Sequence, residues 1–195
     1  MSVAQPLRRI DFDEIDSTNL HARRLVEAGS PETEHSQPLV IVAATQTAGV
    51  GRLGRAWSSP RGGLWCTFVL RPGRPFTEVS DGLGMRIGAA VTEALRAAAG
   101  PEHAPRLQTK WPNDVLLDGR KVCGVLTETA GAGDRLRVLI GVGANIDFSV
   151  TDAPEELRKR ITTMREAFGA ADMPTRERVL AELAPRLLAA VNTAV

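Results

Sequence analysis

The sequence predicts an α+β fold in which a mixed, mainly antiparallel sheet is flanked by helices. Four strand-like segments separated by turn residues fill residues 106–142, and Asp118-Gly119 between two of them favours a hairpin. Segments with a helical spacing of apolar residues lie on both sides of this region. No internal repeat, low-complexity tract or long linker interrupts the 195 residues, so a single domain spanning residues 1–195 is expected.

The N-terminal third is predicted to form a strand, a helix, a second strand and a loop. Residues 7–15 alternate between apolar and polar, and helix-capping residues at 16–19 begin a helix that ends at the turn residues 29–31. The apolar run at residues 38–44 is typical of a buried strand. Residues 45–63 contain five glycines and three arginines without periodicity, which is typical of a functional loop.

The central region is predicted to contain one long helix and the remaining strands. Apolar residues spaced for one helix face occupy residues 83–95, and Gly100-Pro101 ends that helix. Strands are predicted at residues 64–70, 106–111, 115–117, 121–129 and 135–142.

Two helices are predicted in the C-terminal part. Pro154 begins the first, and its expected apolar face consists of Leu157, Ile161, Met164 and Phe168. The second spans residues 175–191 and contains Pro185, which is expected to kink or split it because proline removes a helix hydrogen bond.

Charge and composition exclude several classes of protein. With 24 positive and 23 acidic residues the net charge is +1, so there is no broad basic field and neither nucleic acid nor a membrane is an expected partner. The sequence shows no apolar run of about 20 residues and no secretory signal, which indicates a cytoplasmic location. Cys66 and Cys123 lie in strand-like segments and are expected to be buried thiols.

The loop at residues 49–54 matches the pattern G-x-G-x-x-G of dinucleotide-binding loops. The context does not fit that interpretation, because no helix follows and no acidic residue ends a strand about 20 residues later. Closely spaced glycines nevertheless allow backbone N–H groups to converge on an anion, and Arg52, Arg55 and Arg61 can add positive charge. The loop therefore predicts an anionic ligand, with an ordinary solvated surface loop as the alternative.

Lysine is rare in the chain, and two of its three lysines lie close together in sequence. Lys110 begins the segment Lys110-Trp111-Pro112-Asn113-Asp114, and Lys121 follows soon after. Lysines retained among many arginines indicate a need for a compact ammonium, with ordinary surface lysines as the alternative. Asn113 and Asp114 can hold Mg²⁺ or orient a nucleophile, or they can serve as turn residues.

Taken together, these segments resemble the catalytic domain of biotin protein ligases, within the biotin/lipoate protein ligase family. The resemblance extends from about Phe12 to Asp147, and its motifs occur in the family's order. It implies a mixed sheet flanked by helices, in agreement with the element pattern. The motifs are Ser17-Thr18-Asn19, Gln46 followed by Gly49 to Arg55 and Trp57, Lys110 to Asp114, Lys121 to Gly124, and Gly141 to Asn145.

What the resemblance implies is ATP-dependent activation of biotin to biotinyl-5′-AMP, followed by transfer of biotin to a lysine of a biotin carboxyl carrier protein of acetyl-CoA carboxylase or a related carboxylase. ATP and biotin would be the substrates, and Mg²⁺ an accompanying ion with Asp114 as its candidate ligand. Lipoyl or octanoyl transfer on the same fold is one alternative. A biotin-binding module without full turnover is another, and homodimerisation is left open.

The resemblance also assigns candidate site residues. By similarity, Arg52 and Lys121 hold the biotin carboxylate and the adenylate phosphate. The catalytic candidates are Arg52, Lys121, Lys110 and Asp114. The candidates for biotin binding are Ser17, Thr18, Asn19, Gln46, Val50, Gly51, Arg52, Lys121 and Gly124. The candidates for ATP and adenylate binding are Gly49, Arg52, Arg55, Trp57, Lys110, Asn113 and Asn145.

This chain departs from the family pattern in three places. Relatives usually carry arginine where this chain has Val50, and often also at Leu53. Many relatives continue into a small C-terminal barrel; the sequence here stops about 50 residues after Asn145, so this barrel is expected to be either absent or not included in the sequence. A helix-turn-helix before Leu7 is not expected either, and a repressor function is therefore not expected.

Overall fold

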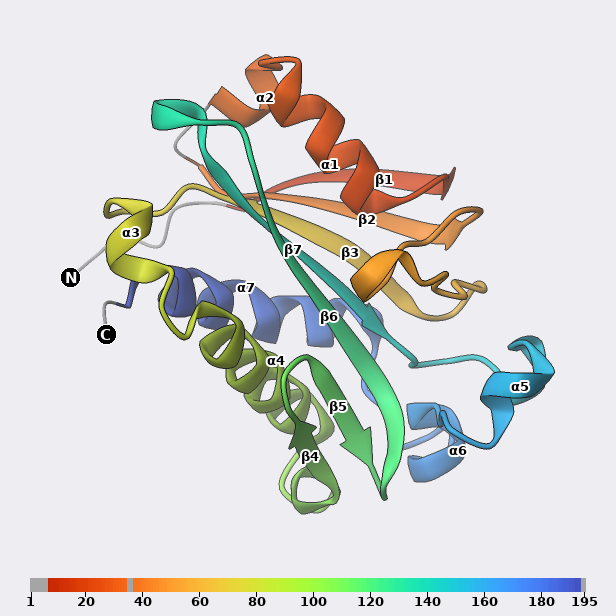
Figure 1. Ribbon diagram of the computed structural model, residues 1–195. Helices are drawn as coiled ribbons and strands as arrows, with labels where there is room; N and C mark the ends of the chain where they lie inside the picture. The colour runs from red at the N-terminus through yellow and green to blue at the C-terminus, as the bar shows by residue number, and fades with distance from the viewer. Residues whose placement is uncertain (1–6, 35–36, 194–195) are drawn as a thin grey trace.

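The computed structural model describes residues 7–34 and 37–193, and a seven-stranded sheet forms its centre (Figure 1). The strand order is β1-β2-β3-β7-β6-β5-β4. β1 runs parallel to β2, and every other neighbouring pair is antiparallel, which confirms the predicted mixed sheet. The strands are β1 (Arg8–Ile15), β2 (Leu39–Gln46), β3 (Leu64–Leu70), β4 (Leu107–Lys110), β5 (Asp114–Leu117), β6 (Arg120–Ala130) and β7 (Arg137–Ala144). The segment before Leu7, where no helix-turn-helix is expected, lies outside the described residues.

Helices cover both faces of the sheet (Figure 1). α1 (Thr18–Glu27) packs on one face, where Ala22 and Val26 are buried together with Ile41 and Leu139 of the sheet. α4 (Leu83–Ala99) and α7 (Arg176–Asn192) lie side by side on the other face and cover the larger apolar core. Within the described residues, no helix combines the length and apolarity needed to cross a membrane.

Short helical segments complete the structure. They are the α-helices α2 (Pro31–Glu34), α3 (Phe76–Val79), α5 (Glu155–Arg158) and α6 (Met164–Phe168), and the 3-10 turns η1 (Arg52–Gly54), η2 (Ala104–Arg106), η3 (Gly133–Arg135) and η4 (Val150–Asp152). α5 and α6 gather at the end of the molecule where β7 ends (Figure 1).

The capping residues predicted at 16–19 begin α1 as expected. Ser17 has an extended backbone, and its Oγ accepts a hydrogen bond from Leu20 N at 3.4 Å. Asp16 Oδ1 accepts from Ser17 N at 2.7 Å. The Asp16 carboxylate also pairs with Arg24, about two turns further along α1, with Nη1 and Oδ2 2.6 Å apart. These contacts hold the first turn of α1, where Thr18 and Asn19 are buried.

The split expected at Pro185 does not occur, because α7 continues from Arg176 to Asn192. Proline has no N–H to donate to the preceding turn. Arg186 Nη1 donates to Glu182 O at 2.9 Å and so satisfies a carbonyl beside the break. Leu183 and Leu187 on either side of Pro185 are fully buried, and this packing holds the helix together despite the lost hydrogen bond.

The single helix predicted from Pro154 to Phe168 is wrong. α5 and α6 occupy its two ends, and Ile161 between them forms an isolated parallel bridge with Lys121 of β6. Lys121 N donates to Arg160 O at 3.0 Å, and Thr162 N donates to Lys121 O at 2.9 Å. Hydrogen bonds to a residue distant in sequence therefore replace the middle of the predicted helix.

Candidate functional site

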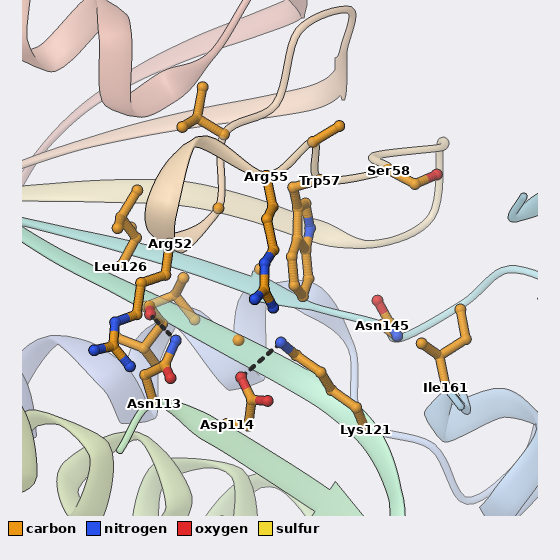
Figure 2. Close-up of a pocket in the computed structure, with 18 of the residues that line it drawn as sticks. Arg52, Arg55, Trp57, Ser58, Asn113, Asp114, Lys121, Leu126, Asn145 and Ile161 are labelled. Atoms are coloured by element: carbon orange, nitrogen blue, oxygen red, sulfur yellow. Dashed lines mark hydrogen bonds and ion pairs between the residues drawn. The ribbon is translucent and has the colours of Figure 1, made fainter. Parts of the chain in front are cut away.

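A cavity of about 570 Å³ lies between the first turn of α1, the loop after β2 and strands β5, β6 and β7 (Figure 2). Fourteen of the sixteen candidate residues line it: Thr18, Asn19, Gln46, Val50, Gly51, Arg52, Arg55, Trp57, Lys110, Asn113, Asp114, Lys121, Gly124 and Asn145. Ser17 and Gly49 are not part of the wall. Ser17 caps α1, and Gly49 O accepts from Trp57 N at 2.8 Å inside the loop.

Strand register aligns four residues of this wall in one row across the sheet. Lys110 of β4 pairs with Asp114 of β5. Asp114 pairs with Gly124 of β6, which in turn pairs with Gly143 of β7. Directly paired residues of neighbouring strands project to the same face of a sheet. An ammonium, a carboxylate and two positions without side chains therefore face the same space.

The indole of Trp57 lies across the two glycines of this row. A Cβ atom at Gly124 would come within 2.8 Å of the Trp57 ring, and one at Gly143 within 2.6 Å of its Nε1 atom. Only glycine leaves room for the indole at these two positions. Trp57 Nε1 is buried and has no hydrogen-bond partner among the described residues, so packing and the nearby Lys121 ammonium, rather than a hydrogen bond, place this side chain.

Lys121 lies between a carboxylate and the indole (Figure 2). Its Nζ atom is 2.6 Å from Asp114 Oδ1 and 4.8 Å from the centroid of the Trp57 ring. The contact with Asp114 has the distance of an ion pair without the alignment of a hydrogen bond, since Oδ1 has no hydrogen-bond partner within the described chain. Both side chains are only about a quarter exposed, at 27% for Lys121 and 22% for Asp114, so an anion that enters here meets a poorly hydrated ammonium.

Four further cations line the cavity, namely Arg52, Arg55, Lys110 and Arg160. None of the four forms an ion pair within residues 7–34 and 37–193, and Asp114 is the one acidic side chain among the described wall residues. Arg52 and Arg55 extend from the loop toward the strand segment that carries Asn113 and Asp114 (Figure 2). The excess of positive charge makes this end of the cavity a site for a polyanion.

The loop after β2 folds back on itself and so carries its arginines over the sheet. Gly51 N donates to Arg55 O at 2.7 Å, and Val50 forms an isolated bridge with Ala56. Val50 thus pairs through its backbone within the loop and also forms part of the cavity wall. Leu53 at the tip has a positive φ of 60° and is 80% exposed, so most of its side chain lies in solvent although the residue is part of the cavity wall.

The other end of the cavity is polar and uncharged. Thr18 and Asn19 from α1 and Gln46 from the end of β2 line it. Gln46 Oε1 accepts from Thr18 N at 2.8 Å, and Gln46 Nε2 donates to Ser59 Oγ at 2.7 Å. Asn19 Nδ2 donates to Glu128 Oε2 at 3.0 Å. Hydroxyl and amide groups held in this way are suited to a small neutral group that carries both donors and acceptors.

Two asparagines of the wall have amide groups that are oriented by main-chain carbonyls. Asn145 Nδ2 donates to Thr162 O, and Asn113 Nδ2 donates to Val125 O, both at 3.0 Å. Thr162 belongs to the segment that pairs with Lys121, so the unpredicted bridge also orients Asn145. The remaining amide atoms of Asn145 are fixed for contact with a ligand.

Part of the wall was not among the candidate residues. Phe148, Leu157 and Ile161 provide an apolar side, and Arg160 provides a further cation. The apolar character of Leu157 and Ile161 is visible in the sequence, but the periodicity assigns them to the core face of a helix. Thr67, a fully buried polar residue in the otherwise apolar strand β3, is also absent from the candidates, although that contrast is a signal in the sequence.

Both cysteines are buried as predicted. Cys66 lines the cavity from β3, and Cys123 lies in β6. Burial raises the pKa of the Cys123 thiol to about 12 and also raises the pKa of the Cys66 thiol. Both thiols are therefore protonated at neutral pH, and the chemistry of the site falls to its cations and amides.

Comparisons of sequence agree with the arrangement of the site. The model of the biotin/lipoate A/B protein ligase family matches residues 12–145. The bifunctional ligase/repressor BirA of Bacillus subtilis is 37% identical over 164 residues, which are 82% of this chain and 47% of that protein. The biotin–acetyl-CoA-carboxylase ligase of Paracoccus denitrificans is 40% identical over 132 residues, which are 67% of this chain and 51% of that protein. The chain thus spans about half the length of the curated relatives it matches.

Solved structures show the same fold, and the family follows from both comparisons. The biotin protein ligase from Aquifex aeolicus in complex with biotin and ATP superposes with a TM-score of 0.70 at 31% identity, covering 94% of this chain and 70% of that one. The biotin protein ligase from Leishmania major in complex with biotinyl-5-AMP gives a TM-score of 0.71 at 27% identity, with 94% and 74% covered. With its motifs gathered in one cavity and the family model matched over residues 12–145, the chain belongs to the biotin/lipoate A/B protein ligase family.

Proposed function

We propose that this chain activates biotin with ATP and transfers the biotinyl group to a lysine of a biotin carboxyl carrier protein. The observation that carries the proposal is a single cavity in which a neutral polar end adjoins a cluster of five cations. Relatives named as biotin ligases, and neighbouring structures described as complexes with biotin, ATP and biotinyl-5-AMP, support it.

In the first step a carboxylate oxygen of biotin attacks the α-phosphorus of ATP, the bond from that phosphorus to the oxygen bridging the β-phosphate breaks, and pyrophosphate leaves. Two anions must approach each other, so fixed cations lower the barrier. We assign Arg52 and Lys121 to the carboxylate and the α-phosphate, and Arg55 and Lys110 to the remaining phosphates. All four line the same cavity.

The neutral end of the cavity suits the ureido ring of biotin. A ureido group has two N–H donors and one carbonyl acceptor, which are costly to bury unpaired. Thr18, Asn19 and Gln46 provide hydroxyl and amide partners there. Trp57 and Asn145 are assigned to the adenine side, Trp57 through packing and Asn145 through its pre-oriented amide.

In the second step the neutral amine of a carrier lysine attacks the acyl carbon, the bond from that carbon to the phosphate oxygen breaks, AMP leaves and the nitrogen loses a proton. Asp114, which lies 2.6 Å from Lys121 Nζ, is the carboxylate that we assign to orient the incoming amine. Residues 50–53 and 55–58 of the loop line the cavity, and closure of this loop would keep water from the mixed anhydride between the two steps.

Magnesium fits this site through one protein carboxylate. Mg²⁺ in nucleotide sites is usually held by one or two carboxylates together with substrate phosphates. Asp114 is the one carboxylate of the described wall, and its Oδ1 atom already contacts Lys121 Nζ at 2.6 Å. Within the described residues no group of three or more His, Cys, Asp or Glu side chains could hold a metal ion, so the ion would depend on Asp114 together with the phosphates of ATP. Bound there with ATP, the ion would neutralise phosphate charge.

Pyrophosphate exchange tests the proposed first step. Labelled pyrophosphate is incubated with the protein and ATP, with biotin, with octanoate or with neither, and incorporation of label into ATP is measured. We expect exchange that depends on biotin. Exchange that depends on octanoate would assign the chain to lipoyl or octanoyl transfer, and biotin binding without exchange would leave a binding module.

A further inference from the structure

A fully buried hydroxyl lies behind the neutral end of the cavity. Thr67 of β3 is 0% exposed, and its Oγ1 lies 2.6 Å from Asn19 Oδ1 and 2.8 Å from Thr18 Oγ1. Thr67 pairs in the sheet with Gly141, where a Cβ atom would lie only 2.2 Å from Asn19 Oδ1. The glycine thus leaves the space in which the Asn19 amide contacts Thr67.

The direction of the hydrogen bonds in this cluster follows first from Glu128. Glu128 Oε2 lies 3.0 Å from the Asn19 side-chain nitrogen. A carboxylate accepts hydrogen bonds, so the amide nitrogen of Asn19 faces Glu128 and its oxygen faces Thr67. An amide oxygen can only accept, and a hydroxyl has one proton. Thr67 therefore donates that proton to Asn19 and can offer Thr18 only a lone pair.

Gln46 provides a second constraint on the direction of these hydrogen bonds. A main-chain N–H donates, so the 2.8 Å contact with Thr18 N identifies the Gln46 atom there as the amide oxygen. Thr18 Oγ1 lies 3.1 Å from that oxygen and 2.8 Å from Thr67 Oγ1. Neither atom has a proton left to give it, so the single proton of Thr18 goes to one of them. The Thr18 hydroxyl thus donates into the wall and presents lone pairs to the cavity.

We propose that Thr67 and Glu128 are positioning residues that, together with Gln46, make Thr18 Oγ1 an obligatory acceptor for an N–H group of the ligand. The inference rests on the proposed function, in which that N–H belongs to the ureido ring of biotin. Thr67 acts through Thr18 and Asn19, and Glu128 acts through Asn19. A saturated acyl chain offers no N–H at this end and leaves Thr18 unpaired, so the ordered protons favour a cyclic urea over a fatty acid.

The test compares Thr67→Val, which keeps the shape and removes the hydroxyl, with Thr67→Ser, which keeps the hydroxyl. The dissociation constant of biotin is measured by titration calorimetry, the KM for ATP by pyrophosphate exchange, and Tm by calorimetry. Thr92→Val is the matched control, because Thr92 is 1% exposed and, among the described residues, its hydroxyl bonds only to Gly88 O and Thr109 Oγ1, at 3.0 and 2.8 Å.

We expect Thr67→Val to weaken biotin binding about tenfold, the usual effect of losing a buried hydrogen-bond partner, with the KM for ATP within about twofold of the parent. Thr67→Ser should restore most of the affinity, and Thr92→Val should bind biotin like the parent. Unchanged biotin affinity in Thr67→Val, or equal losses for biotin and ATP, would overturn the proposal.

Glu128→Gln provides a second test that does not depend on the folding of Thr67→Val. Its amide can donate to Asn19, which removes the fixed direction while keeping the size of the side chain, so biotin affinity should fall severalfold; parental affinity would contradict the inference. A parent that binds biotin but shows no biotin-dependent exchange contradicts the proposed function alone. A parent that binds no biotin contradicts both.

Discussion

Gly124 and Gly143 leave room for the Trp57 indole. Adding one methyl group at Gly124 therefore tests how closely the indole packs there. Gly124→Ala would place a Cβ atom 2.8 Å from the indole and 3.1 Å from Lys121 Cε. Overpacking of this kind typically costs about 1–3 kcal/mol. We expect the indole to shift and biotin binding to weaken about tenfold or more, measured by titration calorimetry. Gly84→Ala in α4 is the control, since its Cβ atom would meet nothing within 4 Å; equal affinities in the two variants would contradict this account.

Asp16 gives a prediction about pH at the start of α1. The hydrogen bond from Arg24 lowers the pKa of the Asp16 carboxyl from 3.8 to about 2. A pKa that is lower in the folded state means that the carboxylate stabilises the fold above its unfolded pKa, and that this contribution is lost as the pH falls toward about 2. Because the group is largely solvated, the contribution is at most a few tenths of a kcal/mol. Urea unfolding at pH 5 and pH 2.5 should show a smaller loss of stability in Asp16→Asn than in the parent.

Individual residues differ in how far the sequence reveals them. Most candidate residues line the cavity. They could be found in the sequence because they belong to short motifs whose combination of residue types is typical of a ligand site. Thr67 and Arg160 belong to no such motif. Thr67 can contact Asn19 only because the fold places β3 beside the start of α1. Arg160 reaches the cavity because its carbonyl accepts a hydrogen bond from Lys121 N.

At the scale of elements, the loop over the cavity is expected to change its mobility with ligand. Arg52 and Arg55 are exposed in the loop, and trypsin can cut after either of them. If the loop closes over a bound adenylate, biotin with ATP should slow cleavage at these two sites several-fold. Cleavage after Arg135, which is exposed in η3, is the internal control. Equal rates at the loop sites with and without ligand would count against closure.

Helix α7 gives a second prediction at this scale. Pro185 is exposed and interrupts the hydrogen bonding of a helix that packing holds together. Pro185→Ala restores an N–H donor and improves helix propensity, partly offset by the greater entropy of the unfolded chain, so the free energy of unfolding should rise by about 2 kcal/mol. Chemical unfolding measures this change. A less stable variant would show that the proline fits a local bend that α7 requires.

The elements that the sequence predicts well are those with strong local patterns, such as α4 and the strands. The error at residues 154–168 has a different origin. Its apolar spacing fits a helix, but the backbone there pairs with Lys121, more than thirty residues earlier, and no local pattern reports such pairing. This pairing also places Ile161 and Arg160 at the cavity.

At the scale of the whole molecule, the sheet register assembles the site. Lys110, Asp114, Gly124 and Gly143 come from four strands and form one row. Mixed-sheet architecture follows from the sequence pattern, but the alignment of this row depends on three strand pairings at once. The neutral end at α1 and the cationic end at the loop then face the same cavity, and the proposed function needs this geometry to bind a neutral ring at one end and bring its carboxylate to a phosphate at the other.

The proposed function requires this one cavity to make and hold biotinyl-5′-AMP. The most direct measurement is to incubate the protein with biotin and ATP labelled in the α-phosphate, remove free ligand by gel filtration, and identify the retained compound by mass spectrometry. We predict close to one biotinyl-5′-AMP per chain in the parent and a strong loss of retention in Arg52→Gly. Retention of ATP or biotin without the adenylate, or of an octanoyl adenylate when octanoate replaces biotin, would contradict it.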